Sequence, residues 1–463
     1  MLSVSEVFEA LNESGINYCH WKSTVRLKES FLGQTDFDLL VDRKDARLLY
    51  QILNEAGFKR RLGTSNKIYP GMEDYLGWDE TTGVIHHFHI HYDLIIGKKF
   101  RKNIVLPFTP SVLDASIEDE IFPIRTIIPE QELIIFITRI ALKTDLTLKN
   151  HVKRILGRDI FPKMISKELD YLLKIVNPEL FRKCIHEWFG DHPVYEAFVE
   201  SYRKGRLMKD FLNLRKDILK GIGSYTRYSK ASVGKMVQIN ETAAKASVTW
   251  VAGGGCILSF IGCDGSGKSS TVSTVESWLS GKLSVKRLYM GLPRKNRINQ
   301  LLIQMNKFAG ATKIKAIKRA VNGMQRVNIA RFKYQLYIQA NQLKNQGHIV
   351  IFDRYPLKAF WEMPKPIDGP RMPENTWWGK LERSYLEKIG DPDHLFLMYV
   401  TEEESVRRKP EHSLEKNRVM IREKIGAIDT FIEKKLDFCQ VIDTVRDQGE
   451  VITDVKRRIW NLL

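Results

Sequence analysis

The sequence has few cysteines, and they do not form recognisable pairs. Its 463 residues include five cysteines, and no two of them have the spacing of a C-x-x-C motif. Without this spacing the cysteines do not suggest a thiolate zinc site, and their scattered positions do not suggest a disulfide framework. We therefore expect a protein of a reducing compartment, the cytoplasm.

Long apolar runs are also absent, and we expect no N-terminal signal segment. The most apolar stretch, residues 133–142, is interrupted by Arg139 and is too short to cross a bilayer. The apolar fraction of 43% is typical of a soluble globular protein. A length of 463 residues exceeds one ordinary core, so two or three domains are expected.

Acidic residues are too few to balance the basic ones. Lys and Arg number 73 against 55 Asp and Glu, which gives a formal net charge of +18. The excess falls after residue 150 and suits a protein that handles polyphosphates. It also permits contact with nucleic acid or peripheral contact with anionic membranes. Basic faces that are merely solvated explain the same charge.

A glycine-rich stretch past the midpoint has the spacing of a phosphate-binding loop. It follows an apolar run at residues 257–261 and reads Gly262, Cys263, Asp264, Gly265, Ser266, Gly267, Lys268, Ser269, Ser270. The glycines allow backbone N–H groups to converge on the phosphates of a nucleoside triphosphate at a helix N-terminus. Lys268 would reach the β- and γ-phosphates of ATP, and Ser269 would ligate Mg²⁺.

Apolar strands recur after this loop at the spacing of an α/β fold. The predicted strands at residues 285–290, 349–352, 395–400 and 441–442 are separated by helical stretches, which indicates a parallel sheet. Asp353 and Arg354 follow the second of these four strands, at the carboxyl edge where such sheets bind ligands. Asp353 would hold Mg²⁺ through water, and Arg354 would clamp the phosphate of an acceptor.

Two motifs in residues 255–455 resemble the thymidylate kinase group of P-loop kinases. The loop matches the form G-x-D-G-x-G-K-[ST], and Asp353-Arg354-Tyr355 matches D-R-[YFH]. The resemblance implies ATP and Mg²⁺ as cofactors. It also implies that Asp264 meets the sugar hydroxyl of the acceptor and that Arg331 binds the acceptor.

The same resemblance implies a lid after the strand at residues 395–400. Arg407 and Arg408 are its candidates for stabilising the transferring phosphoryl group. The residues that recognise thymine in that family are missing after Asp353-Arg354. The chain instead contains Asp368-Gly369-Pro370-Arg371, which resembles kinase-like proteins associated with capsule and polysaccharide biosynthesis. Arg371 is either a second acceptor clamp or an ordinary turn arginine.

Two acidic residues stand two apart in a predicted strand near the N-terminus. Asp36 and Asp38 would share one face of this strand, where a cation such as Mg²⁺ would relieve their repulsion. An ordinary solvated pair is the alternative. A second predicted strand, residues 86–95, alternates so that one face carries His87, His89, His91 and Asp93.

Residues 15–100 resemble nucleotidyltransferases of the DNA polymerase β type. The resemblance implies Asp36 and Asp38 as metal ligands, with Lys22 and Ser23 in the nucleotide-binding turn, where the family usually has Gly-Ser. The third carboxylate is ambiguous. Asp93 is the only acid on the second strand and is the third predicted metal ligand, with His89 or His91 as alternatives.

The predicted organisation has three parts. We expect an α+β nucleotidyltransferase-like domain at residues 1–128, a helical region at 129–245 that includes a basic connector at 201–235, and an α/β P-loop kinase domain with a parallel sheet at 246–463.

These parts predict an ATP-dependent phosphotransferase for a small nucleotide, sugar or sugar-phosphate acceptor. A Mg²⁺-dependent nucleotidyltransferase would be fused to it, in a route to an activated polysaccharide precursor. The alternatives are a nucleic-acid-associated or regulatory NTPase, and an enzyme that nucleotidylylates protein or RNA.

Overall fold

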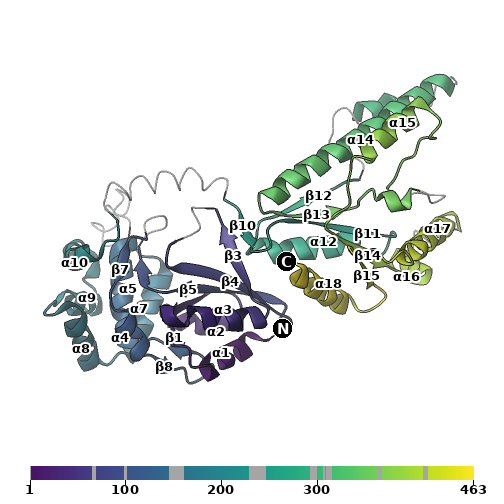
Figure 1. The fold of residues 1–463 in the computed structure, drawn as a ribbon. Coiled ribbons are helices and arrows are strands. Elements are labelled where there is room, and N and C mark those ends of the chain that lie inside the picture. Colours follow the sequence, from purple (N-terminus) through teal and green to yellow (C-terminus); the bar gives the residue numbers. More distant parts are fainter. Residues whose placement is uncertain are drawn as a thin grey trace. The chain divides into compact units, whose positions relative to one another are not determined.

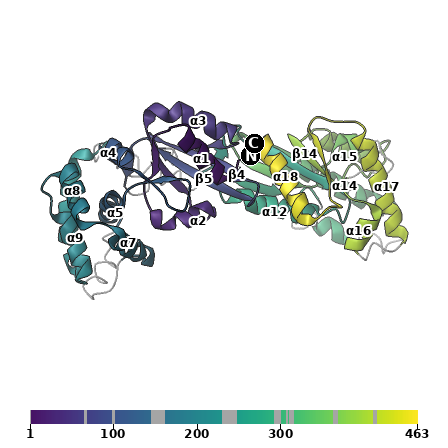
Figure 2. The same cartoon turned by 90° about the horizontal axis from the view of Figure 1, so that it is seen from below.

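The structure is a computed structural model of the chain. It describes residues 2–64, 69–97, 102–144, 161–228, 247–291, 300–305, 308, 315–361, 368–409 and 415–463. The chain divides into two compact units, Met1–Ser247 and Val248–Leu463. Both are drawn in Figure 1 and, from below, in Figure 2.

The first unit is built on a mixed sheet in which β3, β4, β5, β2, β1, β9 and β8 lie in this order. β2 runs parallel to β5 and antiparallel to β1, and β4 is antiparallel to both of its neighbours. The strand bounds are β1 Tyr18–His20, β2 Phe37–Val41, β3 Lys59–Gly63, β4 Met72–Asp79, β5 Val84–His91, β8 Ile117–Glu118 and β9 Arg125–Thr126, with a separate pair β6 Leu94–Ile96 and β7 Ile104–Leu106.

Two amphipathic helices cover one face of this sheet. Phe8 and Leu11 of α1 and Leu49 of α3 are buried in one core with strand residues such as Phe37 and Phe88. The opposite face therefore carries the alternate residues of β2 and β5, which include Asp38, His87, His89 and His91. The helices of this part of the unit are α1 Val4–Glu13, α2 Leu27–Phe31, α3 Ala46–Glu55 and α4 Thr109–Asp114.

The helices after residue 128 belong to the same unit as the sheet. Leu133 and Ile137 of α5 share a core with Leu40 of β2 and with Trp21, which follows β1. Residues 207–221, which we predicted as part of a basic connector, form α10, while residues 229–246 lie outside the described part. The bounds are α5 Pro129–Lys143, α7 Lys163–Ile175, α8 Pro178–Phe189, α9 Val194–Arg203 and α10 Leu207–Gly221.

The second unit contains a parallel sheet of order β12-β13-β11-β14-β15, which confirms the predicted parallel arrangement. Its core holds apolar residues from neighbouring strands, such as Ile257, Val350 and Leu397. The strand bounds are β10 Thr249–Val251, β11 Cys256–Gly262, β12 Val285–Leu288, β13 Ile349–Asp353, β14 His394–Tyr399 and β15 Cys439–Asp443.

Helices cover both faces of the parallel sheet. α12 and α18 lie along one face and the long α14 along the other, where it packs against α15 (Figure 1). The bounds are α12 Lys268–Ser280, α14 Lys315–Asn345, α15 Trp377–Leu386, α16 Glu402–Arg408, α17 Glu415–Ile432 and α18 Gln448–Leu462. Among the helices of the described residues, none combines the length and apolar composition that crossing a membrane requires.

Candidate functional sites

The glycine-rich loop joins β11 to α12 and closes around a buried lysine. Gly265 and Gly267 have φ values of 85° and 77°, a left-handed conformation that glycine adopts without strain. The Lys268 ammonium donates to the carbonyl oxygens of Gly262 at 2.7 Å and Cys263 at 2.6 Å. Burial lowers the pKa of Lys268 to about 8. The loop thus has a cation beneath it and the N-terminus of α12 at its end, as binding of phosphate requires.

Ser269 and Asp353 meet beside this loop, because β11 and β13 are parallel neighbours in register. The Ser269 hydroxyl donates to Asp353 Oδ2 at 2.9 Å. Hydroxyl and carboxylate oxygens are the ligand types that Mg²⁺ prefers, so this predicted pair fits the ion. Arg287 of β12, which the sequence did not indicate, lies 3.2 Å from the same Asp353 oxygen.

Asp264 of the loop lies between two cations. Its carboxylate is 2.7 Å from Lys424 of α17 and 3.8 Å from Arg354, which follows β13. Burial alone would raise the pKa of Asp264, but its hydrogen bond with Lys424 and the nearby positive charges hold the pKa at about 2. Arg354 has a φ of 92°, a strained conformation of the kind that is often found at functional sites.

A cavity of about 380 Å³ opens beside Arg354, between α14, α15 and the segment that follows β12. Four cations and two carboxylates line it: Arg326, Lys333, Arg354, Arg371, Asp368 and Glu382. Positive side chains thus outnumber negative ones on its wall, which favours an anionic occupant.

The cavity includes two of the four predicted acceptor residues. Arg354 and Arg371 line it, whereas Asp264 of the loop does not and Arg331 is exposed on α14 outside it. Arg326 and Lys333 of the same helix do line it. They are seven residues apart and therefore share one helix face, and this periodicity is the signal that the sequence reading did not use.

A second cavity of about 480 Å³ borders the loop on the side of α16 and α18. Both predicted lid arginines line it. Arg408 donates to Gly265 O at 3.3 Å and to Thr444 O at 2.5 Å. Both arginines pair with Glu404 at 2.6 Å, but the Arg407 side chain is 74% exposed and that of Arg408 27%. Arg408 is therefore the lid arginine in direct contact with the phosphate-binding loop.

The predicted turn of the first unit borders a third cavity, of about 370 Å³. Lys22 Nζ lies 2.7 Å from Asp38 Oδ1, and both residues line this cavity with Ser23, Arg26 and Asp36. Burial alone would raise the pKa of Asp38, but the Lys22 charge holds it well below its usual range. Ser23 adopts a left-handed φ of 59°. These four predicted residues are thus brought together.

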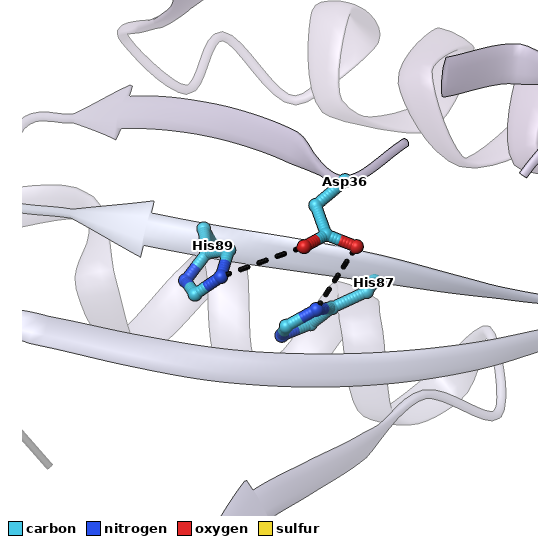
Figure 3. A group of neighbouring side chains, drawn as sticks. All are labelled: Asp36, His87 and His89. Atoms are coloured by element: carbon cyan, nitrogen blue, oxygen red, sulfur yellow. Dashed lines mark ion pairs between the residues drawn. The ribbon is translucent and has the colours of Figure 1, made fainter. Parts of the chain in front are cut away.

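The parallel pairing of β2 and β5 sets Asp38 opposite His89. Figure 3 shows His87 and His89 facing the Asp36 carboxylate, with contacts of 3.1 Å and 3.7 Å. His91 is fully buried, and its Nε2 lies 3.6 Å from Asp38 Oδ1.

Asp93 does not join this group. It lies beyond the end of β5, where the strand alternation no longer applies, and pairs with Arg43 at 3.3 Å. The acid that joins the two histidines is Asp74 of β4. Its Oδ1 lies 3.2 Å from His87 Nε2 and 2.6 Å from His89 Nδ1. The sequence reading missed Asp74 because the pairing of β4 with β5 brings it there from outside both predicted strands.

These residues do not fit the predicted magnesium site of three carboxylates. Asp38 is engaged by Lys22, Asp36 faces two imidazoles, and Asp93 lies elsewhere. Mg²⁺ prefers oxygen ligands, whereas the groups around Asp36 are nitrogen donors.

The helices of the first unit also reach the turn. Glu132 of α5 accepts from the backbone N–H of Thr24 at 3.0 Å, and Ser23 donates to Glu168 of α7 at 3.1 Å. Arg139 of α5 lies 3.9 Å from the same Glu168, and Lys143 at the end of α5 adds a second positive charge near Lys22. The turn thus stands among several positive side chains that the helical part of the unit contributes.

Comparisons with known proteins show a weak likeness to solved structures. Neither a family model nor a curated protein matches the sequence. Among solved structures, the chain is similar to a thymidylate kinase from Candida albicans at a TM-score of 0.30 and 18% identity, over 45% of this chain and 91% of that one. The parallel sheet and loop of the second unit are compatible with a P-loop kinase-like fold.

Proposed function

We propose that the second unit is an ATP-dependent phosphotransferase of the P-loop kinase type, whose acceptor already carries a phosphate group. The observation that carries this proposal is the cavity lined by four cations, one of which, Arg354, also lies 3.8 Å from Asp264 of the phosphate-binding loop. Arg354 touches Asp264 of the loop and lines the cavity, so it links the donor side to the acceptor side.

The donor side has the groups that hold a triphosphate. Lys268 and the backbone of the loop would bind the β- and γ-phosphates, and Arg408 reaches the loop from α16. Ser269 and Asp353 would hold Mg²⁺, which supplies charge neutralisation at these phosphates when bound.

The acceptor side is suited to a phosphomonoester. Arg326, Lys333 and Arg371 would bind its phosphate. Asp264, which lies next to the cavity residue Arg354, would accept a hydrogen bond from a hydroxyl of its sugar. An oxygen of that phosphate then forms the new bond to the γ-phosphorus. The bond from the γ-phosphorus to the oxygen bridging to the β-phosphate breaks, and ADP leaves.

Acceptor-dependent release of ADP tests this proposal. The full chain is assayed with Mg²⁺ and ATP against nucleoside monophosphates, sugar phosphates and the same sugars without phosphate. We expect turnover with a phosphorylated compound and none above background for Lys268→Ala, while Lys286→Ala, an exposed lysine of β12, keeps it. Equal turnover by Lys268→Ala would sink the kinase proposal, and turnover with only unphosphorylated sugars would sink the acceptor class.

The first unit supports a second candidate function, transfer of a nucleotidyl group from a nucleoside triphosphate. The observation that favours it is the set of cations around Lys22, where burial and the neighbouring lysine lower the pKa of Lys102 to about 8. Such a set is suited to a polyphosphate. Residues 368–371 resemble a segment of kinase-like proteins associated with polysaccharide biosynthesis. A kinase and a nucleotidyltransferase in one chain would suit a route to an activated polysaccharide precursor.

Label from an α-labelled nucleoside triphosphate tests this candidate. We expect the full chain to attach the label to a product of the kinase reaction and Asp38→Asn to lose this transfer. Asp42→Asn is the matched control, because Asp42 caps the turn after the same strand and asparagine also caps well. Absence of any transfer would mean that the first unit is not a transferase.

A further inference from the structure

The strand residues around Asp36 form a group with the composition of a transition-metal site. One ligand atom each of Asp36, His87 and His89 lies within 4.8 Å of the other two. Two imidazoles and a carboxylate are the donors that Zn²⁺ and related ions prefer, and catalytic zinc sites often have three protein ligands with one position open.

The distances to the carboxylate are compatible with this use. Asp36 Oδ1 is 3.1 Å from His87 Nδ1, and Asp36 Oδ2 is 3.7 Å from His89 Nε2 (Figure 3). Zinc–ligand bonds of about 2.0–2.2 Å place neighbouring ligand atoms of a tetrahedral site roughly 3.4 Å apart. The two contacts, which involve different oxygens of Asp36, lie on either side of this value.

The second nitrogen of each ring lies close to another carboxylate, and that of His87 is hydrogen-bonded to it. His87 Nε2 is 3.2 Å and His89 Nδ1 2.6 Å from the same oxygen of Asp74. Histidine ligands of metals commonly donate their other ring N–H to a carboxylate, which fixes the tautomer and turns the lone pair toward the ion. Arg61, at 3.6 Å from the other Asp74 oxygen, balances the charge of this supporting group.

The position of Asp36 connects this group to the cavity at the turn. Asp36 lines the same 370 Å³ cavity as Lys22 and Arg26, so a ligand entering there would meet both a metal and cations. An anionic oxygen ligand, such as that of a phosphate group, suits this combination.

We propose that Asp36, His87 and His89 bind a transition-metal ion of the Zn²⁺ class in place of Mg²⁺, with Asp74 as the positioning residue for both histidines. This inference stands on the first unit alone and does not depend on the kinase proposal.

Metal titration of the full-length, untagged, chelator-treated chain tests it. Zn²⁺ binding is followed by calorimetry, and Co²⁺ by its visible absorption, which distinguishes a histidine-ligated ion from the hydrated ion. We expect one such ion per chain at this site, bound far more tightly than Mg²⁺. His89→Gln and Asp36→Asn, whose side chains are 26% and 35% exposed, should each weaken binding by 10-fold or more, an effect of about the size expected for a lost metal interaction.

Three controls make the outcome decisive. His186→Gln removes an exposed histidine of the same unit, with a side chain 74% exposed, and should leave binding unchanged. Asp74→Asn should weaken binding by about 10- to 100-fold and change the Co²⁺ spectrum, whereas a merely structural role would change neither. Ser269→Ala in the second unit should not affect the site. A wild-type affinity for Zn²⁺ no greater than for Mg²⁺, or unchanged binding in both His89→Gln and Asp36→Asn, would show an ion-pair cluster only and overturn the proposal.

Discussion

Two cations on α14 give opposite predictions for the acceptor cavity. Lys333 lines the cavity, is 7% exposed, and donates to Asp368 O at 2.8 Å. Arg331, two residues earlier, is exposed and lies outside the cavity. Replacing each with glutamine removes one positive charge from the same helix. Only the change at Lys333 removes that charge from the wall that is proposed to hold the acceptor phosphate.

The magnitude follows from the strength of one charge-assisted contact. A hydrogen bond to a charged group contributes about 1.5–3 kcal/mol, which corresponds to a change of about 10- to 150-fold in affinity. We therefore expect Lys333→Gln to raise KM for a phosphorylated acceptor by this factor. KM for ATP should stay unchanged, because the triphosphate contacts lie at Lys268 and its loop. Arg331→Gln should leave both values unchanged.

Steady-state release of ADP, with the acceptor and ATP varied in turn, measures both values. Thermal unfolding of each variant shows that the second unit remains folded. An increase of the acceptor KM in Arg331→Gln, with no change in Lys333→Gln, would refute the assignment of the cavity. Equal increases in the acceptor KM and the ATP KM of Lys333→Gln would show that this lysine only supports the fold.

Three further predictions concern packing, the lid and pH. In Gly262→Ala the added Cβ would lie 2.3 Å from Met398 O, and overpacking of this kind should lower the free energy of unfolding in urea by about 1–3 kcal/mol. Arg408→Ala should lower kcat by about 10³-fold or more in rapid-quench assays, as for arginine fingers, whereas Arg407→Ala should have little effect. Burial raises the pKa of Glu132 to about 7, so the folded chain keeps this proton to higher pH than the unfolded chain. Stability should therefore fall by about 3 kcal/mol from roughly pH 4.5 to 8 on account of this group, and urea titrations of Glu132→Gln should lack that part of the fall.

The sequence predicted well what is local in the chain. The loop at Gly262 and its lysine are contiguous, so their spacing alone indicates a strand, a turn and a helix. The apolar runs that follow predicted the parallel sheet, since its central strands β11, β13 and β14 are buried on both faces and read as nearly continuous apolar sequence.

The sequence predicted less of what depends on pairing and helix phase. Asp74 reaches the histidines through the pairing of β4 with β5, which no local pattern specifies. Asp93 was placed by extending an alternation beyond the point where β5 ends. Lys333 and Arg331 are both cations of α14, and the side of the helix on which each lies decides which one lines the cavity. Lys424 reaches Asp264 from a helix far along the chain.

Transfer of label from γ-labelled ATP to a phosphorylated acceptor tests the central proposal most directly. The full chain is incubated with Mg²⁺, labelled ATP and the panel of phosphomonoesters, and the products are separated and identified by mass. We predict label on one class of acceptor, in amounts equal to the ADP formed, and none with Lys268→Ala. Label found only in inorganic phosphate, at a rate that no acceptor changes, would contradict a kinase and indicate an NTPase.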